Sequence, residues 1–566
     1  MRRRTRRSPR RFSAPAPLLI ACLITALAVA CTSVEAPSFQ SAPPSSSPVG
    51  QTGVDRSAAC ALPPKLLRRI WRGTRSPSSG DIQIVTAEPD YAGGGLSHAG
   101  PWDYLQGVPL FFYGPGRIPP LGRVDRSATL ADIAPTFAAL LGFDFEALDG
   151  RVLRSALQPA AMQEDPPRLL VTVVWDGVGR NVLERWAGDW PFLSKLIADG
   201  VWIERAEVGS SPSNTPPAHA TIGTGAFPHH HGVVDLFQQV GEEIVKPHEA
   251  GPDTLLLPTL ADLYDVDHDN EPLVGMVGTL GSHTGMVGHG SRWQGGDADI
   301  AVMRELEDAV TGGREGDVWQ LTTGMAPYFE MPAYVNEVPG IELELEELDR
   351  EDGIVDQAWG RHAFDALDDG FQTPARSPYQ TRIVEEIVAR EGFGADDVPD
   401  LLYVNQKAAD SAGHLFGVGG HEVGRTLRWL DAALEDLVRF LDSHVGPGEW
   451  VMALTADHGM QVDPRESGAL SISVAELSRF IEDRFARGPG RPVVRRARPT
   501  QIWLNERTLA EGGHRLDDVV ARLAAATRED FSAGADLSGD PHAPAFAAVF
   551  PSSDLHDLDC LPDGGS

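Results

Sequence analysis

The 566-residue sequence is poor in positive charge and in cysteine. Asp and Glu outnumber Lys and Arg by 80 to 48, which gives a formal net charge of -32. Because phosphate backbones need basic surfaces, this balance argues against nucleic acid as a partner. A site for anionic substrates would have to override the acidity locally, and bound cations are the obvious means. The hydrophobic share of 42%, with many Gly and Pro residues, indicates a globular, loop-rich chain rather than a disordered one.

The N-terminus has the pattern of an export signal. A basic stretch, MRRRTRRSPRRF, precedes the apolar run Ala14–Ala30, which is too short to cross a bilayer comfortably. The run ends in LAVAC, which resembles a bacterial lipoprotein cleavage box with Cys31 as the lipidated residue, and Arg10-Arg11 loosely resembles a twin-arginine signal. We expect residues 1–31 to direct export, giving a cell-surface lipoprotein held only by its lipid, or a secreted or periplasmic protein. Ordinary secretion and an uncleaved anchor are the alternatives for this segment.

Cysteine is scarce beyond this signal. The exported part has only Cys60 and Cys560. Two cysteines in an oxidising compartment invite a disulfide, but their sequence separation neither forbids nor supports the pairing.

Strand-like and helix-like segments alternate after a flexible linker at residues 32–56, which is rich in Ser, Pro, Ala and Gly. Apolar, β-branched or aromatic runs predict the strands Asp81–Thr86, Val108–Tyr113, Arg168–Trp175, one near Val201, Asp400–Asn405 and Trp450–Thr455. Helical spacing predicts helices at Ala128–Leu141, Pro191–Ala198, Thr381–Arg390, about Glu422–His444, Val474–Ala486 and Arg515–Thr527. Residues from about 264 to 399 are less regular and are interpreted as an inserted lid or cap, and the tail from Arg528 as loop. This order predicts an α/β fold, a mainly parallel sheet sandwiched by helices.

Acidic residues and histidines follow three of the predicted strands. Asp176 comes after RLLVTVVW, Asp410 and His414 after DLLYVN, and Asp457-His458 after WVMALT. In parallel sheets, ligands bind beyond the carboxyl ends of the strands. Charged groups that converge there would repel one another unless cations held them, and carboxylates with imidazoles suit zinc or a similar divalent ion. The sequence therefore predicts a metal site at this edge of the sheet.

The segment Ser210–Val233 presents a hydroxyl group at the start of a predicted helix. Thr215 lies in a loop rich in Ser, Asn and Pro, just ahead of small residues. Such a loop aims a side chain and backbone N–H groups at one point, which suits a nucleophile that attacks an anionic substrate. The alternative is an ordinary helix cap. Metal ions that activate the hydroxyl would favour the nucleophile.

Together these segments resemble the alkaline phosphatase superfamily, and most closely its type I phosphodiesterase/nucleotide pyrophosphatase branch. The resemblance is carried by VTVVWDGVGR, PFLSKLIADGVWIERA, NTPPAHATIGTGAFPHHHGV, DSAGHLFG and LTADHGM. It implies two divalent ions about 4 Å apart, with zinc as the expected metal. The implied ligands of one ion are Asp176, Asp457, His458 and the Thr215 oxygen, and those of the other are Asp410, His414 and one further histidine.

The further histidine precedes the other ligands in this chain. The family surrounds it with a Gly-rich loop, a Pro/aromatic pair and VP with an apolar strand ending in YGPG. The histidines after His458, namely His514, His542 and His556, lack this neighbourhood, whereas His98 within Gly93–Gly116 has it.

The resemblance thus implies a circular permutation of a catalytic domain at residues 57–566. Residues 57–158 would be the family's C-terminal part moved to the front, and residues 159–566 the remainder. Such a rearrangement is tolerable because domain termini often lie close together at the surface. Cys60 and Cys560 would flank the old connection and could form a disulfide across it. The alternative is that residues 60–158 form a separate small domain.

One position departs from the resemblance. Diesterase relatives carry an Asn a few residues after HG, where this chain has Val234-Asp235-Leu236. An anionic Asp is a poor substitute near phosphate. The candidate substitutes are backbone N–H groups around Asn214–Pro216, Lys407 and Arg292, although both basic residues also fit as surface charges.

Several other histidines accompany these motifs. His283 and His289, in GSHTGMVGHG, fit a substrate-pocket loop or a structural loop. His219 and His229–His231 fit an ordering role around the nucleophile loop rather than a metal site.

The resemblance implies an exported hydrolase that cleaves phosphodiester or pyrophosphate bonds of small phosphorylated substrates, such as nucleotides. A phosphomonoesterase, a phosphonate hydrolase and a phosphoglycerate mutase relative are alternatives with the same metal layout. A sulfatase fits poorly because the run from Thr215 to His219 lacks the C/S-x-P-x-R pattern. An alternative of another class is a surface-tethered binding protein with an inactive site.

Overall fold

The computed structural model describes residues 57–159, 166–248, 251–304, 319–488, 490–532, 539–556 and 560. The predicted export signal, the linker and Cys31 lie outside the described residues. Within the described ranges, every helix is too short or too polar to cross a membrane.

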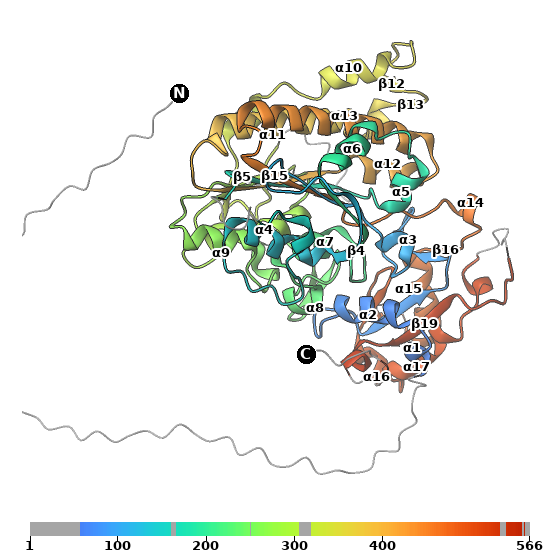
Figure 1. Cartoon of the computed structure of the whole chain (residues 1–566). Coiled ribbons are helices and arrows are strands. Elements are labelled where there is room, and N and C mark those ends of the chain that lie inside the picture. The colour runs from blue at the N-terminus through green and yellow to red at the C-terminus, as the bar shows by residue number, and fades with distance from the viewer. Residues whose placement is uncertain are drawn as a thin grey trace, which may run out of the picture. The chain divides into compact units, whose positions relative to one another are not determined.

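The main sheet has nine strands, in the order β11-β10-β9-β14-β5-β15-β3-β6-β4 (Figure 1). At its centre, β5 pairs in parallel with β14 on one side and β15 on the other. Of the nine described strands, β3 alone runs antiparallel to its two neighbours. This sheet confirms the predicted mainly parallel α/β fold. Its strands are β3 (Leu110–Tyr113), β4 (Gly122–Thr129), β5 (Leu169–Trp175), β6 (Val201–Glu207), β9 (Val274–Val277), β10 (Asp299–Val302), β11 (Phe329–Glu330), β14 (Asp400–Gln406) and β15 (Trp450–Thr455).

Helices cover both faces of the sheet (Figure 1). One face carries α5 (Arg180–Arg185), α6 (Pro191–Leu196), α11 (Arg376–Ile387), α12 (Ala408–Phe416) and α13 (His421–His444), and the other carries α4 (Ile133–Leu141), α7 (Thr215–Thr224) and α9 (Leu260–Asp267).

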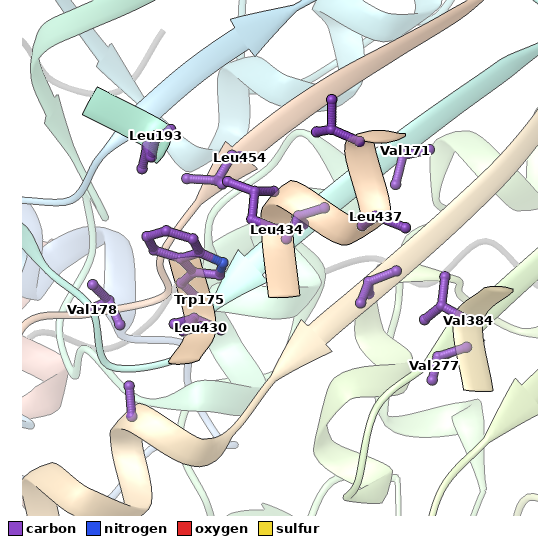
Figure 2. Packing of buried hydrophobic residues seen from close by; sticks show 14 of the residues in the cluster. Val171, Trp175, Val178, Leu193, Val277, Val384, Leu430, Leu434, Leu437 and Leu454 are labelled. Atoms are coloured by element: carbon purple, nitrogen blue, oxygen red, sulfur yellow. The ribbon is translucent and has the colours of Figure 1, made fainter. Parts of the chain in front are cut away.

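The apolar run of β5 is continuous because the strand is buried on both faces. Alternate side chains go to opposite layers: Val171 and Trp175 join the α13 side, and Leu170 joins the α4 side. Figure 2 shows Leu430, Leu434 and Leu437 of α13 packed in the cluster that holds Trp175. Their spacing of four and three residues makes one apolar stripe along the helix. This core fixes β5 and therefore the position of the residues that follow it.

A second, antiparallel sheet has the order β17-β18-β1-β19. It consists of β1 (Ile82–Thr86), β17 (Val494–Ala497), β18 (Gln501–Leu504) and β19 (Phe546–Pro551), with α15 (Val474–Phe485) and α17 (Leu516–Ala524) contributing to its core. The interpretation of the tail from Arg528 as loop is wrong at β19, which pairs along β1 over most of its length. The apolar run of β19 is short, and its pairing partner lies at the other end of the chain, so local patterns offer little sign of it.

In two regions the observed secondary structure differs from the prediction. The expected helix Ala128–Leu141 begins as the end of β4, because the Asp132 side chain accepts the backbone N–H of Thr129 and directs a tight turn before α4. Residues 264–399 contribute β9, β10 and β11 to the main sheet, in addition to the segments outside it.

The remaining α-helices and β-strands are α1 (Ser57–Cys60), α2 (Pro64–Gly73), β2 (Tyr91–Ala92), α3 (Asp103–Gln106), α8 (Pro228–His231), β7 (Gln238–Val240), β8 (Glu243–Val245), α10 (Glu342–Arg350), β12 (Ala358–Trp359), β13 (His362–Ala363), α14 (Pro464–Ser467), β16 (Ser471–Ile472) and α16 (Glu506–Glu511).

The two ends of the described chain are joined covalently. Cys60, at the end of α1, forms a disulfide with Cys560 across a sequence separation of 500 residues. A small apolar cluster that includes Leu62, Val85 and Phe550 surrounds this link.

Candidate active site

The ends of the three central strands bring the predicted acidic residues and histidines together. Asp176 follows β5, Asp410 lies on α12 after β14, and Asp457 follows β15. All three carboxylates are buried, with at most 2% of the residue exposed. Because buried carboxylates need partners, their surroundings decide what the site can hold.

The candidate ligands form two groups. Within each group, one ligand atom per residue lies within 4.8 Å of the others. The first group is Asp176, Asp457 and His458, and the second is His98, Asp410 and His414. These are the two sets that the sequence resemblance implied, with His98 coming from the loop before β3.

Several atoms of these groups lack a hydrogen-bond partner among the described residues. They are Oδ1 of Asp410, Oδ2 of Asp457 and Nε2 of His458, and all three atoms are buried. Nε2 of His458 lies 3.2 Å from Oδ2 of Asp457 and 3.9 Å from Oδ1 of Asp410. Two carboxylate oxygens and a ring nitrogen that converge at such distances fit the donor set of a divalent cation.

The histidine tautomers agree with this fit. The Nδ1 atom of His98 lies 2.9 Å from the carbonyl oxygen of Ser213, and that of His458 lies 3.0 Å from the carbonyl oxygen of Gly459. A carbonyl can only accept, so Nδ1 carries a proton in both rings, and Nε2 is the nitrogen that faces the carboxylates. Metal-binding histidines commonly donate their other ring N–H in this way. The two rings also stack, with centroids 3.5 Å apart.

The electrostatics of the site favour cations. Burial opposes charge on His458, but the carboxylates of Asp457, Asp410 and Asp176 outweigh it and raise its pKa to about 9. Burial likewise opposes the Asp176 carboxylate, yet Lys407 and the neighbouring histidines hold its pKa well below its usual range. The field that favours a proton on His458 favours a metal ion at the same nitrogen.

Thr215 is the first residue of α7 and is 6% exposed. Its Oγ1 atom lies 3.5 Å from Nζ of Lys407. Pro216 and Pro217 follow directly, and proline has no backbone N–H. The N–H donors expected around Asn214–Pro216 can therefore come from Asn214 and Thr215 but not from Pro216.

Lys407 connects the two ligand groups. Its Nζ atom lies 2.8 Å from Oδ1 of Asp176 and 2.6 Å from Oδ2 of Asp410. Burial disfavours its charge, but the carboxylates outweigh burial and raise its pKa. The side chain is 12% exposed, so the structure places it in the site rather than on the surface.

The two other expected substrate contacts are engaged elsewhere. The Asn214 side chain donates to Oδ1 of Asp235 at 2.6 Å and so points toward the segment where the resemblance led us to expect an Asn. Asp235 also accepts from Gln501 at 2.9 Å, which ties the loop that carries Asn214 to the second sheet. Arg292 is half-exposed and donates to Asp253 at 2.7 Å.

A third group, formed by Asp176, His219 and His283, has ligand atoms equally close together. Both nitrogens of His219 are occupied, since Nδ1 donates to the Thr215 carbonyl at 2.7 Å and Nε2 accepts from Asn405 at 2.9 Å. Nδ1 of His283 accepts backbone N–H groups, which leaves its Nε2–H facing Oδ2 of Asp176 at 3.6 Å. These two histidines therefore orient Thr215 and Asp176, in line with the expected ordering role of His219.

Sequence patterns missed two polar residues of the site. Asn405, at the end of β14, donates to Oδ2 of Asp176 at 3.0 Å. Arg376, in α11, is a buried cation in the electrostatic range of Asp176 and Asp410, and burial lowers its pKa to about 10. The strand position of Asn405 was a usable signal, whereas nothing local to Arg376 distinguished it from a surface arginine.

Known proteins resemble parts of this chain. Alkaline phosphatase PafA of Elizabethkingia meningoseptica is 28% identical over 155 residues, 26% of this chain and 28% of its own length. Alkaline phosphatase PhoD of Zymomonas mobilis is 28% identical over 193 residues, 32% of this chain and 31% of its own length. The chain thus spans less than a third of these two relatives. The solved structure of wild-type PafA superimposes with a TM-score of 0.46 at 18% identity, covering 63% of this chain and 76% of that one.

A family model covers more of the chain than any of these pairwise matches to relatives. The model of type I phosphodiesterase / nucleotide pyrophosphatase matches residues 170–554, a range that holds Asp176, Thr215, Asp410 and Asp457. His98 lies ahead of that range. The chain therefore belongs to the type I phosphodiesterase/nucleotide pyrophosphatase family, within the alkaline phosphatase superfamily.

Proposed function

We propose that the protein is an exported, metal-dependent hydrolase that cleaves phosphodiester or pyrophosphate bonds of small phosphorylated substrates through Thr215. One observation carries the proposal. Nζ of Lys407 lies within 2.8 Å of one carboxylate from each ligand group, Asp176 and Asp410, and 3.5 Å from the Thr215 hydroxyl. The hydroxyl therefore lies at the junction of two cation-binding groups.

Two divalent ions, with zinc as the best match to carboxylate and imidazole ligands, would be held by these groups. When bound, they would lower the pKa of the Thr215 hydroxyl and offset the charge of a phosphoryl group. The residues that would hold one ion are Asp176, Asp457 and His458, with the Thr215 oxygen, and those that would hold the other are His98, Asp410 and His414.

The chain's own residues define the reaction. Thr215 Oγ1 gives its proton to solvent and attacks phosphorus in line, so that a phosphothreonine forms as the bond to the leaving oxygen breaks. The leaving group departs with that oxygen and takes up a proton from solvent. Water then cleaves the phosphothreonine and restores the hydroxyl. Lys407, whose ammonium is next to Oγ1, would donate a hydrogen bond to a phosphoryl oxygen during both steps. His219 holds the Thr215 backbone, and Asn405 holds Asp176.

A phosphomonoesterase is the second candidate. A monoester carries one more negative charge than a diester, and the buried cation Lys407 next to the nucleophile would favour that extra charge. The relatives PafA and PhoD are named as alkaline phosphatases. A phosphonate hydrolase of the same superfamily and a binding protein with an inactive site are the further outcomes that an experiment has to separate.

The permuted chain order is also a proposal. Residues 57–158 would be the family's C-terminal part moved to the front. Three observations support this: His98 completes the second ligand group, β3 lies between β15 and β6, and Cys60 is bonded to Cys560. A re-permuted chain that starts near residue 159 and ends near residue 158 should fold and keep its metal content, whereas an independent small domain at 60–158 would fold when expressed alone.

Export with lipidation of Cys31 is proposed from the N-terminal pattern. Labelling of the bacterial host with a radioactive fatty acid tests it, with Cys31→Ser as the control. Label that persists in this variant would contradict lipidation at this position.

The function is tested by metal analysis combined with a substrate panel. We expect about two equivalents of zinc per active site and hydrolysis of a diester, a monoester and a phosphonate at clearly different rates. The fastest substrate assigns the class. A purified, folded protein that holds no metal after zinc addition and turns over none of the three would instead support the inactive binding protein.

A further inference from the structure

A second place in the molecule, outside the candidate active site, brings two histidines and a carboxylate together. His229 and His230 lie in α8, and Asp149 lies in the loop after α4. One ligand atom from each residue lies within 4.8 Å of the others. The sequence suggested that these histidines only order the nucleophile loop, but their hydrogen bonds indicate that they can also bind a ligand.

The tautomer of His229 is set by the backbone. Its Nδ1 atom lies 3.1 Å from the carbonyl oxygen of Arg72, at the end of α2. Because a carbonyl only accepts, Nδ1 carries the proton and Nε2 carries a lone pair. The ring is held in place from one side by Trp71, with ring centroids 4.5 Å apart.

Among the described residues, no hydrogen-bond donor reaches the lone pair on Nε2 of His229. Nε2 of His229 is buried without a hydrogen-bond partner among the described residues, and its side chain is only 10% exposed. The atom points at Oδ1 of Asp149, 3.7 Å away. Two acceptors facing each other gain nothing without a cation between them. Metal–ligand distances of about 2.0–2.2 Å place two ligands of a tetrahedral ion about 3.3–3.6 Å apart, close to the observed separation.

The other two ligands are fixed but reachable. Asp149 is anchored by the backbone N–H of Phe227, which donates to Oδ2 at 2.7 Å. Nδ1 of His230 lies 2.8 Å from the same Oδ2 atom, and the His230 side chain is 39% exposed. A metal ion would replace the proton between these two atoms and could complete its coordination with water from the open side.

We propose that Asp149, His229 and His230 form a site for a divalent transition metal, with zinc as the matching ion. Two imidazoles and one carboxylate suit zinc better than calcium or magnesium, which prefer oxygen ligands. Arg72 also interacts electrostatically with Asp149, so one positive charge already acts on the carboxylate and moderates the affinity.

Such an ion would link three stretches of the chain. It would tie α8 to the loop at Asp149 and, through the Nδ1 hydrogen bond of His229, to the end of α2. The helix α8 follows shortly after α7, which begins with Thr215. The ion would therefore fix the turn behind the nucleophile helix without contacting the substrate.

The test counts zinc in the holoenzyme after dialysis against micromolar zinc chloride. The double variant His229→Asn/His230→Gln removes both ligand nitrogens, while the Asn side chain can still donate to the Arg72 carbonyl. The control is His542→Gln, since the His542 side chain is 73% exposed and bonds to Glu529 on the surface. We expect wild type and control to hold one equivalent of zinc more per chain than the double variant.

Equal zinc content in all three proteins would overturn the proposal, and so would an extra equivalent that binds only at millimolar zinc. If the double variant does not fold, zinc-edge anomalous diffraction from wild-type crystals decides the matter. A peak bounded by Asp149, His229 and His230 would support the site, and a map without one would refute it. Neither result depends on phosphate-ester hydrolysis, so this test can fail or succeed separately from the proposed function.

Discussion

Replacing Lys407 with methionine tests the electrostatics of the candidate active site. The ammonium lies 2.8 Å from Asp176 and 2.6 Å from Asp410, and its side chain is 12% exposed. Methionine keeps most of the length and removes the charge. Removing one partner of a buried ion pair typically costs about 3–5 kcal/mol, because the remaining charges stay buried without compensation.

The cost can be converted into a melting temperature. An unfolding entropy of about 2.1 cal/mol/K per residue gives about 1 kcal/mol/K for a chain of this size, so the metal-free variant should melt about 3–5 °C below wild type. In zinc-saturated protein the ions supply positive charge to the same carboxylates, and the difference should shrink. Turnover should still fall, because Lys407 lies 3.5 Å from the Thr215 hydroxyl.

Lys65 provides a matched control. It also bridges two carboxylates, Asp103 at 3.0 Å and Glu207 at 3.1 Å, but its side chain is 54% exposed. Solvent-exposed ion pairs contribute at most about 1 kcal/mol, so Lys65→Met should shift the melting temperature by about 1 °C or less, with or without zinc. Calorimetry of both variants, with and without chelator, checks the reasoning. Equal shifts for the two lysines, or a Lys407→Met shift that ignores zinc, would refute it.

Three further predictions concern separate parts of the molecule. Thr215→Ala should lower turnover by several orders of magnitude while zinc content stays nearly unchanged, since the other ligands remain; loss of the metal together with activity would indicate a structural role instead. Cys60→Ser should lower the free energy of unfolding by about 2–4 kcal/mol under non-reducing conditions only, and finding both Cys60 and Cys560 as free thiols in denatured, unreduced wild type would contradict the link. Burial opposes charge on His289, but the hydrogen bond to Asp262 at 2.8 Å outweighs it and raises the pKa above its usual 6.5. The charged His289 therefore stabilises the folded state fully below about pH 6.5, and this stabilisation is lost as pH rises through the raised pKa. His289→Gln should flatten the decline of the melting temperature above pH 6.5. An equally steep decline in wild type and variant would count against this.

The centre of the fold follows directly from the sequence. The buried strands β5 and β15 are almost entirely apolar, β14 is apolar over residues 401–404, and parallel strands present their carboxyl ends at one edge. That rule alone predicts that Asp176, Asp410 and Asp457 lie together. The local sequence pattern and the sheet geometry predict the same strands here. Both faces of these strands are covered, so apolar and polar residues need not alternate along them.

Long-range pairing is beyond the reach of local patterns. The strand β19 is defined by β1, which lies at the other end of the chain, and its own sequence has no turn signal that indicates the partner. Arg376 is similar, since its burial depends on the packing of α11 against the sheet rather than on its neighbours in sequence. His98 was found only because the resemblance supplied an expected neighbourhood, which local chemistry could not.

The histidines show what decides between a metal ligand and a structural role. His98, His458 and His229 each place Nδ1 against a backbone carbonyl, which leaves Nε2 as the nitrogen that faces a carboxylate. Both nitrogens of His219 are already bonded, and His283 directs its Nε2–H at Asp176 because backbone N–H groups occupy its Nδ1. The residue type is the same in both sets. His219 also places Nδ1 against a carbonyl, but Asn405 occupies its Nε2. The groups opposite both ring nitrogens are known only once the chain has folded, so a histidine motif in sequence predicts where a ligand can be but not which nitrogen is free to bind.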